Sequence, residues 1–425
     1  MTERLYYRNS FLYDFTASVR EVRALDGRRA LVLDCTAFYA TSGGQPHDTG
    51  WMEFVSPDGK SLPAMPKLRV SEVAEADDGE ILHFVENFEG EIPAPISIHG
   101  FIDVDRRQDH TQQHSGQHVL SAMFLKLFGA PTVSFHLGEE SCTIDLEISS
   151  LTPAQLEEAE RRANQAVWED RQVLMHEATA EQARQAGVRK IPEADHQRLR
   201  LIEIRGIDLC ACGGTHVLTT GRIGNIQLRK VERVKQGMRV EFVCGLRALR
   251  SARRDFQLLT ETAALYSCGL ADAPAQTQKL LDVGRGAQKQ QQKLLAEIAE
   301  LTALQTLSRT NLEDGRKIVV ASFPDRDAAF VKLFAQKLAS AEPNVIALAG
   351  AGLGNPTLVF AQSVGGGFDA GSVLKSIVSS VGGRGGGTRD LAQGGVPSAE
   401  SVPELLQRAA EMAREQQQAG KSAHD

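Results

Sequence analysis

Two short segments, far apart in the sequence, carry side chains that commonly bind metal ions. The first is His114-Ser-Gly-Gln-His118, in a stretch that reads as a helix, and the second is Cys212-Gly-Gly-Thr-His216, in a glycine-rich turn. Histidines four residues apart project from one face of a helix, so both imidazoles can reach one ion. A thiolate and a third imidazole would complete a tetrahedral zinc site of three nitrogens and one sulfur. We therefore predict a Zn2+ site that joins two distant parts of one domain.

The spacing of these residues does not decide two features of the site, namely which histidines bind the ion and what the ion does. The helix also carries His110, and only two adjacent turns can readily share one ion, so His110/His114 and His114/His118 are alternative pairs. The role of the ion is equally open. Four protein ligands are typical of a structural zinc, whereas a catalytic zinc usually keeps one position for water or substrate.

The length of 425 residues is too great for one ordinary core and predicts about two to four domains. Residues 1–95 contain short alternating apolar runs and predict an N-terminal β-barrel-like domain. Residues 96–246 mix strand and helix periods, which predicts an α+β domain holding both halves of the zinc site. Residues 247–312 are polar and helical, and we expect a connector there. Strand and helix patterns then alternate in 313–425, so the overall fold class is multidomain α+β with a C-terminal α/β domain.

Several local signals define these domains more finely. Asp77-Asp78-Gly79 predicts a hairpin turn, and Pro93-Ala-Pro95 marks the first boundary. We expect a strand over Ile96–Val104 and a helix over His110–Phe128. Gly284 and Gly286 are expected to interrupt the helical seam of the connector, because glycine is a poor helix former.

The charge distribution is uneven. The net charge of −7 argues against a protein that coats nucleic acid indiscriminately, yet the segment 222–254 holds ten Lys and Arg residues against Glu232 and Glu241. Such a segment can hold a polyanion locally, and a solvated helix and strand face explains it equally well. The six cysteines suggest no disulfide framework, and no apolar run approaches a membrane span. We expect a cytoplasmic protein that makes no contact with a membrane.

Two glycine-rich segments add further candidates. The first is Ser42-Gly-Gly-Gln-Pro-His-Asp-Thr-Gly50. Its glycines let the backbone approach another surface, and Asp48 could brace the loop through its side chain. A plain β-turn explains the same residues equally well. Gly382-Gly-Arg-Gly-Gly-Gly387 could present backbone N–H groups to a phosphate, with Arg384 and Arg389 adding charge. It lacks the ending of a nucleotide P-loop, so it does not indicate ATP binding.

Taken together, these motifs resemble one family. The editing domain of alanyl-tRNA synthetases has a motif similar to Cys212-Gly-Gly-Thr-His216-Val217. It also has an upstream His-x3-His followed by an apolar pair, as this chain does. The segment 38–50 is similar to the glycine-rich motif that precedes that domain, and 382–393 is similar to the C-terminal DHH-associated domain. A full synthetase carries an aminoacylation domain ahead of these modules, whereas this chain begins at the β domain. The chain thus resembles the freestanding long-form AlaX editing proteins.

The resemblance implies a set of site residues. It favours His114 and His118 over His110, and it makes Cys212 and His216 the remaining zinc ligands. Gln117 stands where many members have a threonine that helps to select serine, and we assign it to the reaction together with His114 and His118. We assign contacts with the tRNA or its aminoacyl end to a wider set, namely Ser42, Gly43, Gly44, Asp48, Arg247, Arg250, Arg254, Arg384 and Arg389.

The implied activity is the hydrolysis in trans of mischarged Ser-tRNA(Ala), with Gly-tRNA(Ala) as a further candidate. A tRNA(Ala) that carries a wrong amino acid is the expected partner, and the helical or C-terminal region is a candidate surface for a homodimer. One alternative is a zinc-braced tRNA-binding module without activity. Another is a metallohydrolase for small amides or peptides, but the sequence contains no His-Glu-x-x-His motif.

Overall fold

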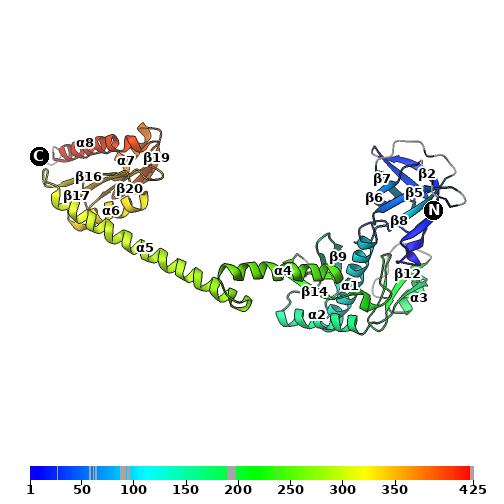
Figure 1. Ribbon diagram of the computed structural model, residues 1–425. Coiled ribbons are helices and arrows are strands. Elements are labelled where there is room, and N and C mark those ends of the chain that lie inside the picture. Colours follow the sequence, from blue (N-terminus) through cyan, green and yellow to red (C-terminus); the bar gives the residue numbers. More distant parts are fainter. Residues whose placement is uncertain are drawn as a thin grey trace. The chain divides into compact units, whose positions relative to one another are not determined.

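A computed structural model describes residues 1–25, 27–56, 59–60, 62, 65–86, 92, 96–188, 198–235 and 237–421. The chain divides into two compact units, Met1–Thr262 (unit 1) and Ala263–Asp425 (unit 2) (Figure 1). Among the described residues, no helix is both long and apolar enough to cross a membrane.

Unit 1 begins with a closed six-stranded barrel. Its strands, in barrel order, are β2 (Asp14–Leu25), β3 (Arg28–Leu33), β7 (Ile81–Glu86), β6 (Leu68–Glu75), β5 (Gly50–Val55) and β8 (Ser97–Ile102). The alternating apolar residues of these strands point inward and form a buried core around Phe38, Phe54 and Val70. A short helical turn, η1 (Leu5–Tyr7), and the paired short strands β1 (Glu3–Arg4) and β4 (Cys35–Thr36) complete this part. The predicted barrel is confirmed.

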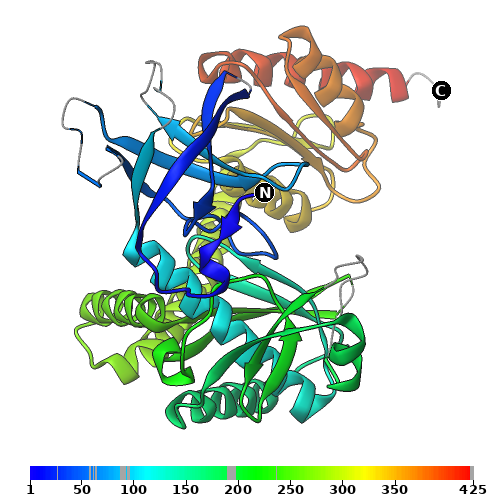
Figure 2. The same ribbon diagram turned by 90° about the vertical axis from the view of Figure 1, so that its right-hand side faces the viewer.

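The second part of unit 1 surrounds one long helix, α1 (Val104–Phe128), which leaves the barrel and enters the α+β part (Figure 2). A four-stranded sheet packs on it in the order β14 (Ile226–Val234), β15 (Gly237–Cys244), β10 (Cys142–Leu146) and β9 (Thr132–Leu137). A three-stranded sheet contains β11 (Val173–Ala178), β12 (Leu199–Ile204) and β13 (Asp208–Ala211). The other helices are α2 (Pro153–Trp168), α3 (Ala180–Gln185), η2 (Thr220–Ile223) and α4 (Gly245–Leu265).

A fully buried ion pair joins the barrel to the start of α1. Asp48 and Arg107 both have side chains without solvent exposure, and Arg107 Nε lies 3.1 and 3.0 Å from the two carboxylate oxygens. The remaining guanidinium donors reach the carbonyls of Ser10 and Ala37, and Asp48 accepts a further hydrogen bond from the backbone N–H of Tyr39. The pair is therefore fully hydrogen-bonded, as a buried charge must be. Asp48 is the brace that the sequence suggested.

Unit 2 consists of a long helix and a five-stranded sheet covered on both faces. The strand order is β16 (Lys317–Phe323), β17 (Val345–Ala351), β18 (Thr357–Gln362), β20 (Leu391–Gly395) and β19 (Arg384–Gly387). One apolar core joins the sheet to α5 (Ala273–Arg309) and α6 (Ala328–Ala341). A second core joins it to α7 (Ala370–Ser380) and α8 (Val402–Lys421). The short turns are η3 (Leu270–Asp272) and η4 (Ala399–Ser401).

Two local expectations were wrong. The first helix begins at Val104 rather than His110. Its first turns lack the apolar periodicity of a helix, and the buried contact of Arg107 holds them in place. The glycines at 284 and 286 do not interrupt the connector, because α5 is one helix of 37 residues. Two glycines cost about 1 kcal/mol each relative to alanine, and the strong helix formers around them offset that.

Pro93-Ala-Pro95 lies outside the described residues, and the four-domain division stays a prediction.

Candidate metal centre

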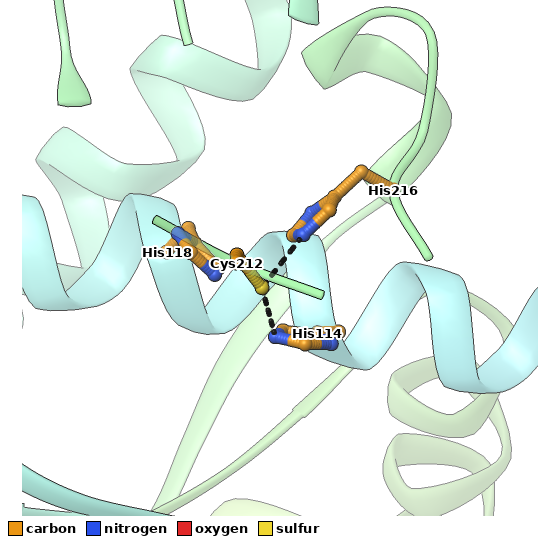
Figure 3. Close-up of side chains that lie close together, drawn as sticks. All are labelled: His114, His118, Cys212 and His216. Carbon is orange, nitrogen blue, oxygen red and sulfur yellow. Dashed lines mark hydrogen bonds between the residues drawn. The ribbon is translucent and has the colours of Figure 1, made fainter. Parts of the chain in front are cut away.

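The four predicted ligands converge in unit 1. His114 and His118 lie one turn apart on α1, and Cys212 and His216 come from the loop that follows β13 (Figure 3). Their ligand atoms all lie within 4.8 Å of one another. Cys212 Sγ is 3.4 Å from His114 Nε2 and 3.3 Å from His216 Nε2. The structure therefore brings together the set that includes His118, which the resemblance favoured over His110.

The backbone of the Cys212 loop is held by close packing and by one arginine. A Cβ atom at Gly214 would collide with the imidazole of His114, so only glycine lets the loop approach the helix so closely. Arg200, on β12, donates through Nη1 to the carbonyls of Cys212 and Gly214, each at 2.8 Å. Its Nε donates to the carbonyl of Tyr7 at 3.2 Å. Arg200 thus holds the carbonyl groups of the two residues on either side of Gly213, one of which is Cys212.

Gln45, from the glycine-rich segment of the barrel, orients His114. Its Oε1 accepts from the backbone N–H of Thr215 at 3.1 Å, and its Nε2 lies 2.9 Å from Thr215 Oγ1. Because a backbone N–H can only donate, the amide oxygen must face it. The same oxygen lies 2.7 Å from His114 Nδ1, which must then carry the proton. His114 Nε2 is left free to bind an ion, which is the usual arrangement of a metal-binding histidine.

The other two histidines also have partners on the ring nitrogen that faces away from the cluster. His216 Nδ1 lies 3.3 Å from Ser115 Oγ. His118 Nδ1 lies 3.3 Å from Asp208 Oδ2 and 3.0 Å from Cys210 Sγ. Each imidazole therefore has an outer contact that fixes its orientation, as in known metal sites.

The protonation states suit metal binding. Burial opposes ionisation of Cys212, but His114 and His216 lower the pKa of its thiol well below the usual value. Burial lowers the pKa of His216 to about 3, so its ring is neutral. Burial also disfavours the charged form of His118, but Cys210 and the Asp208 carboxylate raise its pKa well above the usual value. A metal ion binds the thiolate of cysteine and the neutral form of histidine, so its binding here would displace any proton that Cys212 or His118 carries on its ligand atom.

The spacing of the donors fits a tetrahedral ion. Zinc bonds of about 2.3 Å to sulfur and about 2.05 Å to nitrogen, at the tetrahedral angle, place the two donors roughly 3.6 Å apart. The two sulfur–nitrogen distances of 3.4 and 3.3 Å are close to that value. A mixture of imidazole and thiolate also suits zinc better than magnesium or calcium. The cluster can therefore hold a metal ion, and its chemistry favours zinc.

An open cavity of about 570 Å³ adjoins the cluster. His114, His118 and Cys212 line it, together with Gln117, Ser42 and Gly43. Gly43 and Gly44 form a tight turn with φ of +57° and +86°, and a Cβ atom at Gly44 would lie 2.8 Å from the carbonyl oxygen of Phe135. The turn of the barrel can therefore pack directly against β9 and form one wall of the cavity. Ser42, Gly43 and Gln117 thus lie beside the cluster, whereas Asp48 is buried behind the turn.

The remaining predicted residues lie elsewhere. His110 is buried, its Nδ1 has no hydrogen-bond partner among the described residues, and burial lowers its pKa to about 3. Arg247 is largely buried, binds both oxygens of Asp109 and donates to the carbonyl of Gly138. Arg250 and Arg254 are exposed on α4. Arg384 and Arg389 belong to unit 2, where Arg384–Gly387 forms the edge strand β19.

Three residues that contact the site were missed by sequence reasoning. Gln45 lies inside the glycine-rich segment that we singled out, directly after Gly44. Asp208 precedes the ligand loop by a few residues and could have been found as a carboxylate near two cysteines. Arg200 gave no signal, because one arginine in an apolar strand usually points to solvent.

Two family models match the chain. The DHHA1 domain matches residues 315–415, and the Threonyl and Alanyl tRNA synthetase second additional domain matches residues 199–240. The second range contains Cys212 and His216, and the first covers the sheet of unit 2. A solved structure of the C-Ala domain from Aquifex aeolicus alanyl-tRNA synthetase aligns with 24% of this chain and 95% of that chain, at 22% identity and a TM-score of 0.23.

Whole-chain similarity is of two kinds. The chain is 30% identical over 422 residues to the alanine–tRNA ligase of Methanospirillum hungatei, which covers 95% of this chain but 43% of the ligase. It therefore spans less than half the length of such ligases. It is also 28% identical over 410 residues to the alanyl-tRNA editing protein AlaX-L of Pyrococcus horikoshii, covering 96% of both chains. The chain is thus an AlaX-L-like protein, and the resemblance inferred from its motifs is confirmed.

We expect Cys212 to be essential for the metal and Cys210 to be dispensable. Cys212→Ala removes the only sulfur of the four-residue cluster and should abolish stoichiometric zinc binding, measured by elemental analysis after dialysis against a zinc buffer. Cys210→Ala is the matched control, because it removes a thiol two residues away and should keep one zinc per chain. Loss of zinc from the Cys210 variant alone would contradict the ligand assignment.

The orientation of His114 by Gln45 can be tested with two variants of similar size. Gln45→Met removes the acceptor for the His114 Nδ1–H group and should weaken zinc affinity about 10- to 100-fold, as changes in such outer contacts typically do. Gln45→Glu keeps an acceptor oxygen and should retain most of the affinity. Competition with a chromophoric chelator measures both, and circular dichroism checks the fold. A Gln45→Met protein with unchanged affinity would exclude this role.

Proposed function

We propose that this chain is a zinc-dependent aminoacyl-tRNA deacylase that hydrolyses mischarged Ser-tRNA(Ala) in trans, with Gly-tRNA(Ala) as a second substrate. The observation that carries the proposal is the cluster of three histidines and one cysteine beside an open cavity, in a chain similar end to end to an alanyl-tRNA editing protein. The volume of the cavity lies within the range of small-molecule sites. It could take an aminoacyl group together with part of the terminal nucleoside.

The metal ion and the side chains that would hold it have separate roles in this proposal. When bound, zinc would polarise an ester carbonyl and stabilise the charge that develops on it, an effect of several kcal/mol. The side chains of the cluster, held by Gln45, Ser115 and Asp208, supply a rigid wall against which the aminoacyl end would bind. Preorganised groups of this kind need no rearrangement during the reaction.

Gln117 is the residue that we propose to read the amino acid. Its Nε2 donates to Ser121 Oγ at 2.8 Å, and Ser121 Oγ also accepts from Thr132 Oγ1 at 2.7 Å. This contact uses the Nε2 of Gln117, and Gln117 lines the cavity, where its Oε1 can accept a further hydrogen bond. A hydroxyl of a bound seryl group could donate to this oxygen. Alanine and glycine offer no such donor, so with either of them this acceptor would stay unpaired once substrate covers it, which is costly and would favour Ser-tRNA(Ala) over both.

A deacylation panel tests the activity. With tRNA(Ala) charged with serine, glycine or alanine, we expect rapid release of serine, slower release of glycine and little release of alanine. A chelator that removes zinc should abolish the activity, and added zinc should restore it. Tight binding of all three tRNAs without turnover would instead indicate the non-catalytic tRNA-binding module.

Replacement of Gln117 tests the selectivity. Gln117→Leu removes the acceptor oxygen, and loss of one such hydrogen bond costs about 1–3 kcal/mol, so kcat/KM for Ser-tRNA(Ala) should fall roughly 5- to 150-fold. The kcat/KM for Gly-tRNA(Ala), which offers no hydroxyl, should not fall. Gln108→Leu is the matched control, because Gln108 is an exposed glutamine on the same helix. Equal losses for the two substrates would show that Gln117 contacts a group common to both.

A further inference from the structure

A second cavity lies against the other side of the ligand loop. Its volume is about 630 Å³, and it shares Ser42, Ala211, Cys212 and Gly213 with the cavity beside the cluster. The two spaces are therefore neighbours separated by the turn of the barrel and the segment that carries Cys212. A ligand too long for the first cavity could continue into the second.

Arginine dominates the lining of this second cavity. Four arginines line it, against two glutamates, Glu3 and Glu177. The arginines come from two distant parts of the chain, and they are Arg4, Arg8, Arg198 and Arg200. A concave surface with an excess of guanidinium groups attracts anions, and the fork of a guanidinium matches the oxygens of a phosphate.

Two of these arginines are fixed parts of the wall. Arg200 is held by three backbone carbonyls and lies 5.3 Å from the centre of the Tyr7 ring. Arg4 lies 2.5 Å from a Glu75 carboxylate oxygen and 5.7 Å from the centre of the same ring. Their positive charge is therefore held in place, although Glu75 offsets that of Arg4.

The other two arginines are free to change partners. Arg8 is 77% exposed and lies 3.0 Å from Glu3, and Arg198 is 76% exposed and lies 2.8 Å from Glu177. Both glutamates are at least half exposed as well. Ion pairs between such exposed side chains contribute little to stability. A phosphate could therefore replace either glutamate as the partner at low cost.

We propose that this cavity binds the phosphates of the last single-stranded nucleotides of the RNA substrate, through Arg8 and Arg198. The proposal rests on the proposed function, which places the ester at the 3′ end of the RNA beside the cluster. The RNA chain must then extend away from the cluster. The second cavity adjoins the first, and its arginines could bind the phosphates of the next nucleotides. Arg8 and Arg198 then set affinity and register and take no part in the bond cleavage.

The test uses the full chain with both arginines replaced. Arg8→Gln/Arg198→Gln should raise the KM for Ser-tRNA(Ala) about tenfold and weaken the binding of a four-nucleotide RNA that ends in CCA to a similar extent. It should also reduce the salt slope of oligonucleotide binding by roughly 1.4, the value for two single-strand phosphate contacts. The turnover number at saturation and the bound zinc should stay as in the wild type.

The matched control is Arg161→Gln/Arg162→Gln on α2. It removes the same charge from two exposed arginines that pair with Glu158 and line neither of the two cavities, and should leave the KM and the salt slope unchanged. If the Arg8/Arg198 variant behaves like this control, the phosphate site is overturned whether or not the chain hydrolyses Ser-tRNA(Ala). Oligonucleotide binding that depends on Arg8 and Arg198, without any turnover, supports the phosphate site and contradicts only the proposed hydrolysis.

Discussion

The candidate metal centre depends on one buried amide, that of Gln45. This side chain belongs to the barrel, yet it contacts His114 on α1 and Thr215 in the ligand loop. Three segments that are distant in the sequence therefore meet at one group. Because the backbone N–H of Thr215 fixes which way the amide points, the amide also fixes the tautomer of His114. Loss of this contact would affect both the position and the protonation of a ligand, whereas loss of a surface contact would affect neither.

The buried pair of Asp48 and Arg107 supports this arrangement from behind. It connects the glycine-rich segment, which contains Gln45, to the first turns of α1, which carries His114. Burial of two charges is costly unless every donor and acceptor is satisfied, and here the carbonyls of Ser10 and Ala37 complete the set. Replacement of either partner alone would leave an unpaired buried charge between the barrel and the helix, which is strongly destabilising.

The sequence allowed much of this architecture to be predicted, for identifiable reasons. The strands of the barrel and of unit 2 have alternating or continuous apolar runs, and the hairpin at Asp77-Asp78-Gly79 has the residues of a tight turn. The ligand set followed from side-chain chemistry, and the choice of His118 over His110 followed from the resemblance. The start of α1 and the role of Arg200 could not be predicted, because both depend on contacts with distant residues. The hydrophobic pattern of a short stretch of sequence does not reveal such contacts.

The distribution of positive charge shows the same limit. The segment 222–254 looks basic along the sequence, but in the fold Arg229 pairs with Asp255, Arg239 with Asp145 and Arg247 with Asp109. These ion pairs neutralise part of the positive charge that the segment shows along the sequence. The four arginines of the second cavity come from positions 4, 8, 198 and 200, and no window of the sequence contains them all. An anion responds to the charges that surround it in space. A chain with a net negative charge can therefore still present an arginine-lined cavity beside its candidate metal centre.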